Sequence, residues 1–130
     1  MINKVTLLGN LGADPDIRVQ ESGLKMARLR VATTERIFLK ESQTIREHTE
    51  WHTVIVWRQL ADLADRYLRK GSQVYIEGAL RHRDWTDKDG IKHTSAEIAG
   101  SDIKLLGRRE SAEKESKSAT EVDENNNMPF

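Results

Sequence analysis

The sequence predicts an all-β domain, a five-stranded Greek-key barrel with one helix between its third and fourth strands, followed by a disordered C-terminal tail. Three observations support this prediction. Five runs rich in apolar and β-branched residues occur along the chain, and only one segment places its apolar residues at helical spacing. The residues after 107 are charged and rich in Ser and Asn, with almost no apolar residues among them.

The five runs show the period-two alternation of strands that cover a core with one face. In the second run Ala27, Leu29 and Val31 share a face and are predicted core residues, so Arg28 and Arg30 point outward. The runs comprise residues 3–11, 26–34, 50–57, 73–85 and 94–106.

The third run contains "TEWHTVIVW", which holds two of the chain's three tryptophans at an even spacing. Because side chains alternate along a strand, Trp51 and Trp57 share a face, about 20 Å apart at roughly 3.3 Å per residue. Val54 and Val56, which are ordinary core residues, occupy the opposite face. We therefore expect both indole rings on the outside of the barrel.

The segment "RQLADLADRYLRKG", residues 58–71, has the period of an amphipathic helix. Basic residues near its end suit the negative pole of the helix dipole, and Gly71 is expected to terminate the helix. The predicted apolar stripe consists of Leu60, Leu63, Ala64, Tyr67 and Leu68.

The stretch "DKDG", residues 87–90, is a turn signal that would join the fourth and fifth runs into a long hairpin. Three strands, one helix and two further strands is the element order of the OB-fold, a five-stranded Greek-key barrel that commonly binds oligonucleotides. Residues 1–107 are expected to form this domain. Residues 108–130 are expected to be the disordered tail, because they bury too little apolar surface to offset the entropy of ordering.

Composition excludes several classes of site. The chain has 130 residues and no cysteine, so it has neither a disulfide framework nor a thiolate site. The N-terminus lacks the features of a secretory signal and no apolar run is long enough to span a membrane, so we expect a cytoplasmic protein without a membrane partner. Net charge is zero, with 17 basic and 15 acidic residues in 1–107, so the position of the charges matters more than their sum.

The fourth run places Arg81, Arg83 and Trp85 on one face, so an aromatic ring again lies among guanidinium groups. Single-stranded nucleic acid fits this pattern, because bases stack on flat rings for about 1 to 3 kcal/mol each and Arg binds phosphates. A tryptophan in a small domain is more often a core residue. The shared face of Trp51 with Trp57, and of Trp85 with two arginines, favours a binding surface.

No catalytic set, metal site or cofactor site is predicted, so we do not expect an enzyme. Glu50 and His52 are interpreted as a pair at the barrel edge or at a subunit interface. The acidic residues in 84–89 lack the distal Glu of a calcium loop, and the glycines of "GNLG" have no following Lys-Ser/Thr or helix. Three scattered histidines are interpreted as solvated: His48, His82 and His93.

The stretches "NKVTLLGNLGADPDIR", "EWHTVIVWRQLADLADRYLRKGSQVYIEGALRHRDWTDKDG" and "SDIKLLG", with the terminal "MPF", closely resemble the bacterial-type single-stranded DNA-binding proteins. The resemblance covers nearly all of residues 1–107 and returns at the last two residues. It implies an OB-fold that assembles as a homotetramer and is wrapped by single-stranded DNA without sequence preference. It also implies a role in replication, recombination and repair in the bacterial cytoplasm, at the nucleoid.

By this resemblance the base-stacking aromatics are Trp51, Trp57 and Trp85, the three rings chosen from strand parity. A fourth stacking position, in the loop after the second strand, is Ile37 here, with Phe38 beside it. Either Phe38 substitutes through a one-residue shift of the loop, or binding is weaker. Residues that resemble the family's phosphate contacts are Lys4, Lys70, Arg81 and Arg83, whereas Asp84 stands where a basic residue is often found.

The C-terminal tip resembles the family's docking peptide for replication and repair enzymes. The apolar residues Met128, Pro129 and Phe130 are kept, but Asn residues replace several of the usual aspartates just before them. We expect a pocket-filling anchor with less electrostatic steering. The alternative is an inert solubilising tail.

Two other functions remain open at this point. One is an RNA-binding or primosome-accessory OB module, which a comparison of DNA and RNA binding distinguishes. The other is a protein-interaction scaffold whose aromatic face meets a partner protein, and which would show no quenching of tryptophan fluorescence by oligo-dT.

Overall fold

The structure is a computed structural model that describes residues 1–108, which form one helix and six strands. The predicted docking tip Met128, Pro129 and Phe130 lies outside the described residues. In chain order the elements are β1 (Val5–Leu11), β2 (Asp16–Val19), β3 (Lys25–Leu39), β4 (Thr44–Trp57), α1 (Gln59–Tyr67), β5 (Ser72–Thr86) and β6 (Lys92–Arg108).

Five of the strands close into a barrel. The sheet order is β1-β5-β6-β4-β3-β2, and a further pairing of β1 with β3 closes the ring and leaves β2 outside it. Neighbouring strands are antiparallel except β4 and β6, which pair in parallel at Val54 and Ile55. The predicted five-stranded barrel is confirmed, with the helix between its third and fourth strands. Because the short strand β2 was not predicted, these strands are β4 and β5 in the full count.

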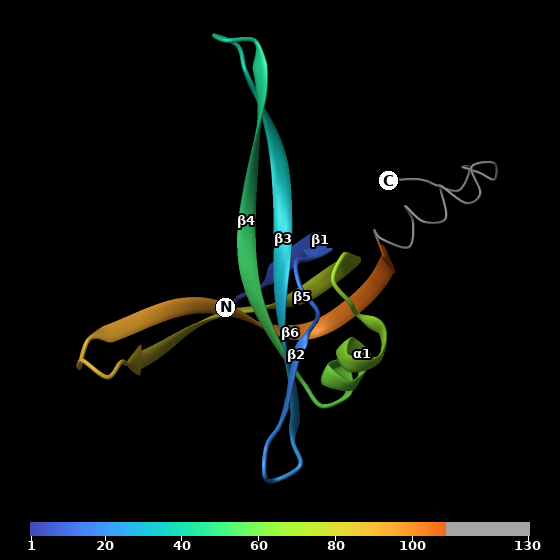
Figure 1. The fold of residues 1–130 in the computed structure, drawn as a ribbon, viewed down its shortest axis with the longest axis vertical. Helices are drawn as coiled ribbons and strands as arrows, with labels where there is room; N and C mark the ends of the chain where they lie inside the picture. Colours follow the sequence, from blue (N-terminus) through green and yellow to red (C-terminus); the bar gives the residue numbers. More distant parts are fainter. Residues whose placement is uncertain (109–130) are drawn as a thin grey trace, which may run out of the picture.

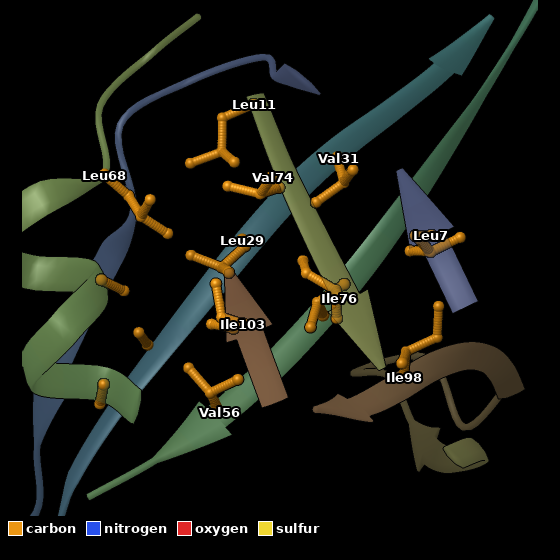
Figure 2. Close-up of a cluster of buried hydrophobic side chains, with 14 residues drawn as sticks. Leu7, Leu11, Leu29, Val31, Val56, Leu68, Val74, Ile76, Ile98 and Ile103 are labelled. Atoms are coloured by element: carbon orange, nitrogen blue, oxygen red, sulfur yellow. The ribbon is translucent and has the colours of Figure 1, made fainter. Parts of the chain in front are cut away.

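The barrel core consists of the residues that strand alternation selects. Ala27, Leu29 and Val31 on β3 and Val54 and Val56 on β4 are all fully buried, as predicted. Figure 2 shows their neighbours from the other strands converging on the same centre. These neighbours are Leu7, Leu11, Val74, Ile76, Ile98 and Ile103.

Helix α1 packs against the barrel through a narrow face of Ala61, Ala64 and the following Leu68, all fully buried. The prediction was wrong for Tyr67, which lies at the flank of this face and is 57% exposed. The helix also ends at Tyr67, earlier than predicted, because Leu68 is already extended. Gly71 adopts its positive φ of 92° in the turn into β5, where its N–H donates to the Leu11 carbonyl at 2.9 Å.

Two long hairpins extend from the barrel in different directions (Figure 1). The first, β3–β4, continues well beyond the predicted strand ends at residues 34 and 50. Ile37 and Phe38 therefore lie within β3, not in a loop. Cross-strand pairs extend the ladder: the Thr34 and Thr49 hydroxyls are hydrogen-bonded at 2.9 Å, Arg36 Nε lies 3.6 Å from Glu47 Oε2, and Phe38 is opposite Ile45.

The second hairpin, β5–β6, turns at the predicted "DKDG" stretch. Gly90 has a φ of 81°, and its N–H donates to the Asp87 carbonyl at 3.0 Å. The turn sets a register in which Trp85 is directly opposite His93. No helix within residues 1–108 has the length and apolar character needed to cross a membrane.

Candidate nucleic-acid interface

The outer face of the β3–β4 ladder carries two exposed indole rings. Trp51 is 51% exposed and Trp57 39% exposed, whereas Val54 and Val56 between them point inward and are fully buried. Strand alternation therefore places both rings on the barrel surface, as the sequence predicted.

Two arginines lie on the same face, on the neighbouring strand. Arg28 is opposite Ile55 and Arg30 is opposite Thr53, so both guanidinium groups lie between the positions of the two tryptophans. The Arg30 Cζ atom is 5.2 Å from the centroid of the Trp51 ring, within the range of a cation–π contact. The surface thus places two cations between two flat rings.

The Trp51 ring rests on the backbone at Gly12, which follows β1. A Cβ atom added to Gly12 would lie 2.3 Å from the Trp51 Cζ3 atom, and the Gly12 N–H donates to the Arg30 carbonyl at 2.9 Å. The glycine therefore makes room for the indole. Sequence reasoning considered Gly12 only as part of a rejected phosphate cradle and missed this contact.

The register of the β3–β4 hairpin separates the two alternatives for a fourth aromatic. Counting in steps of two from Trp51 along the ladder leads to Phe38 on the same face, while Ile37 falls on the opposite face. Phe38 is 59% exposed near the end of the hairpin. The geometry therefore favours Phe38, without any shift of a loop.

The third tryptophan lies on the β5–β6 hairpin in a chain of contacts. The Arg83 Cζ atom is 5.0 Å from the Trp85 ring centroid, and Arg83 Nε lies 3.2 Å from Glu97 Oε2. Arg81 is exposed on the same face, opposite Glu97. His93, interpreted from the sequence as a solvated residue, has a side chain that is 41% exposed, and its ring also stacks on Trp85 with centroids 5.1 Å apart.

Asp84 lies on the opposite face of β5 from Trp85. Its Oδ1 atom accepts a hydrogen bond from the Thr94 hydroxyl at 2.7 Å. The negative charge that seemed unfavourable in the sequence therefore points away from the indole and its arginines.

The two remaining basic candidates lie on other elements. Lys4 precedes β1, and its Nζ atom is 4.0 Å from Glu77 Oε2 on the neighbouring β5. Lys70 lies between α1 and β5, where its backbone N–H donates to Asp14 Oδ1 at 2.8 Å and its side chain is exposed. The structure does not bring these two lysines together with the tryptophans.

The interpretation of Glu50 and His52 as a mutual pair was wrong in detail. Glu50 Oε2 is 2.8 Å from His48 Nε2, and this hydrogen bond is the main cause that lowers the pKa of the Glu50 carboxyl. His52 Nε2 is instead 2.8 Å from the Thr33 hydroxyl. All of these groups lie on the face opposite to Trp51. Within residues 1–108 no group of three acidic or histidine side chains is placed to hold a metal ion.

Residues 2–106 match the model of the "Single-strand binding protein family". The chain belongs to the single-strand binding protein family. This family is one of binding proteins and not of enzymes, which agrees with the expectation from the sequence.

Two relatives illustrate the similarity. "Single-stranded DNA-binding protein 1" of Xylella fastidiosa (strain 9a5c) is 45% identical over 109 residues, which cover 84% of this chain and 80% of the relative. The solved structure described as "Plasmodium falciparum SSB complex with ssDNA" is 34% identical with a TM-score of 0.75, and the match covers 82% of this chain and 96% of that one. The predicted OB-fold is thereby confirmed.

Proposed function

We propose that this chain binds single-stranded DNA without sequence preference and protects it during replication, recombination and repair. The observation that supports this most directly is the outer face of β3–β4, where Trp51 and Trp57 are exposed beside Arg28 and Arg30. Membership in the single-strand binding protein family and the similarity to a structure described as a complex with ssDNA point the same way.

Base stacking supplies the sequence independence. Every base has a π face, so a base stacks on an indole for about 1 to 3 kcal/mol whatever its identity. In a duplex those faces are already stacked on neighbouring bases, so exposed rings select for unpaired strands. In our proposal Trp51 and Trp57 receive bases on one strand ladder, Phe38 extends that ladder, and Trp85 continues the path on the second hairpin.

Phosphate contacts supply the remaining affinity. Arg28 and Arg30 lie among the rings, and Arg81 and Arg83 lie beside Trp85. Their guanidinium groups donate to phosphate oxygens and also stack on bases. Lys4 and Lys70 are proposed as outlying contacts on the path of a longer strand.

We also propose that the chain assembles as a homotetramer. Strand β1 pairs with β5 along Val5 to Asn10, but it pairs with β3 only at Asn10 and Leu11. Most of its second edge therefore has no strand partner within residues 1–108, and Leu8 is 56% exposed on the adjoining surface. Such an edge is a template for pairing with another copy of the same strand.

The tip Met128, Pro129 and Phe130 is proposed to dock replication and repair enzymes. Its support is the sequence alone, an apolar end on a polar tail. A bacterial cytoplasmic location at the nucleoid follows from this function and agrees with the bacterial relative.

Binding curves test the proposal. We expect tight binding to oligo-dT and to mixed-sequence single strands, and little binding to duplex. The log–log salt dependence should have a slope of about −0.7 per neutralised phosphate. Equal binding to duplex and single strands would refute the proposal, and a clear preference for matched RNA would favour the RNA-binding alternative.

The assembly has its own test. Sedimentation of the full chain alone should show the mass of a tetramer. With a long oligo-dT the protein should remain a tetramer, and its sedimentation coefficient should be high for its mass because wrapped DNA makes the complex compact. A monomer at micromolar concentration would contradict the proposed assembly.

A further inference from the structure

The side chain opposite Trp85 on the β5–β6 hairpin is a histidine with a fixed position. We propose that His93 is a further DNA-binding residue, which forms a two-ring platform with Trp85 and brings a titratable positive charge to the bound strand. The inference rests on the proposed function, because it takes Trp85 as a ring that receives a base.

The two rings are stacked in the free protein. Trp85 and His93 are direct cross-strand partners, their centroids are 5.1 Å apart, and their planes differ by 20°. Nearly parallel offset rings at this separation attract one another. The imidazole covers part of one face of the indole, and both residues remain about 41% exposed, so a base can extend this short stack on an exposed ring face.

The imidazole is held from its other side by the turn. His93 Nε2 lies 2.8 Å from Asp87 Oδ2, and Asp87 Oδ1 accepts the backbone N–H groups of Asp89 and Ile91 at 2.9 Å each. The carboxylate is thus fixed by the turn backbone and in turn fixes the ring. A platform ordered before DNA arrives loses less conformational entropy on binding.

The same contacts make the platform sensitive to pH. The hydrogen bond from His93, followed by that from the Ile91 N–H, lowers the pKa of the Asp87 carboxyl, so Asp87 stays ionised when the imidazole is neutral. The pair then carries one negative charge beside Trp85, and protonation of His93 cancels it. The other charged groups facing this pair are Arg83, over the same indole, and Glu97, which binds Arg83.

The sign of the effect follows from the charge of DNA. Acidification from about pH 8 to about pH 5.5 spans the range in which histidine side chains gain a proton. Acidification over this range adds a positive charge next to the phosphates, so affinity for single strands should rise as pH falls. Because Asp87 shares the charge of the protonated ring, the log–log slope of the salt dependence should steepen by no more than about 0.7, the value for one phosphate.

The test compares two substitutions at His93 with a matched histidine. His93→Phe keeps an aromatic ring but cannot be charged, and His93→Ala removes both properties. His82→Phe is the control, because His82 lies on the same hairpin, on the face opposite to Trp85. Each full-length variant is titrated with oligo-dT at about pH 8 and about pH 5.5 over a series of salt concentrations. Thermal melting shows which variants are folded.

We expect His93→Ala to bind about three- to tenfold more weakly at both pH values, the fold-change that corresponds to an aromatic pair. His93→Phe should bind like the parent chain at the higher pH but lack the gain on acidification. Its slope at the lower pH should be shallower by up to about 0.7. His82→Phe should behave like the parent chain throughout.

The inference is overturned if His93→Phe keeps the full gain in affinity and the same slope at low pH. Because this variant keeps the ring, that result decides the matter even if His93→Ala fails to fold. Trp85→Ala separates this failure from a failure of the proposed function. If Trp85→Ala weakens binding while His93→Phe matches the parent chain at both pH values and in salt slope, the proposed charge of His93 is wrong but Trp85 still receives a base. If Trp85→Ala also binds like the parent chain, the platform itself is absent.

Discussion

Replacement of Trp51 by Ala separates a binding role from a structural role most clearly. The ring is 51% exposed, and its buried part lies against Gly12 outside the core cluster, so its loss opens no cavity in the barrel core. The fold would lose the contact with Arg30, a cation–π interaction worth about 0.5 to 1 kcal/mol at an exposed site. DNA binding would lose a stacked base, about 1 to 3 kcal/mol. The dissociation constant should therefore rise by roughly fivefold to 150-fold, since about 1.4 kcal/mol corresponds to a factor of ten.

The assay is a titration of labelled oligo-dT at one fixed salt concentration, followed by fluorescence anisotropy, with thermal melting of each variant beside it. Trp51→Phe is the matched control, because it keeps a ring on the same strand face and should lose less affinity. The melting temperature of Trp51→Ala should stay within a few degrees of the parent chain. Unchanged affinity would show that the ring receives no base, and a large drop in melting temperature would show that it belongs to the core.

Three further changes test other parts of the account. Gly12→Ala should displace the Trp51 ring by steric conflict and weaken oligo-dT binding by up to the amount lost in Trp51→Ala; wild-type affinity would show that the indole adjusts freely. Leu8→Lys places a charge beside the edge of β1 that lacks a strand partner within residues 1–108 and should dissociate the proposed tetramer in sedimentation, whereas an unchanged mass would exclude that edge as an interface. Deletion of residues 128–130 should leave oligo-dT affinity intact and abolish capture of replication and repair enzymes in pull-downs, and unchanged capture would contradict the docking role.

The order of strands and helix predicted the barrel, and strand alternation predicted the orientation of its side chains. Val54 and Val56 can only be buried together if Trp51 and Trp57 point outward, because the period of a strand is two. The barrel then needs both valines, since they contribute to a core of aliphatic residues from every barrel strand. The alternating pattern therefore predicts that the tryptophans point outward, because burial of the two valines requires it.

Local sequence patterns were less reliable for features that tertiary contacts determine, such as the exposure of Tyr67 and the length of β3 and β4. Tyr67 has helical spacing, but the barrel accepts only the small residues Ala61 and Ala64 and the terminal Leu68, so the tyrosine stays at the surface. The extension of β3 and β4 is stabilised by polar cross-strand pairs such as Arg36 with Glu47, which have no apolar alternation to mark them.

The contacts around Trp85 depend on the register of the β5–β6 hairpin, which strand alternation alone does not define. The "DKDG" turn was recognised, but the strands were not paired residue by residue across it, so His93 was not placed opposite Trp85. Counting outward from residues 87–90 would have placed Lys92 opposite Trp85, because the observed turn also includes Ile91. Gly12 had no comparable signal, because its neighbour Trp51 is far away in the chain and comes close only when the barrel closes.

Quenching of the intrinsic tryptophan fluorescence by oligo-dT tests the central claim most directly, since it reports on the indole rings themselves. The account predicts strong quenching that saturates with added single strand, weakens with added salt, and is nearly absent with duplex of the same length. Emission that stays constant while oligo-dT demonstrably binds would show that no base reaches Trp51, Trp57 or Trp85, and would contradict the account.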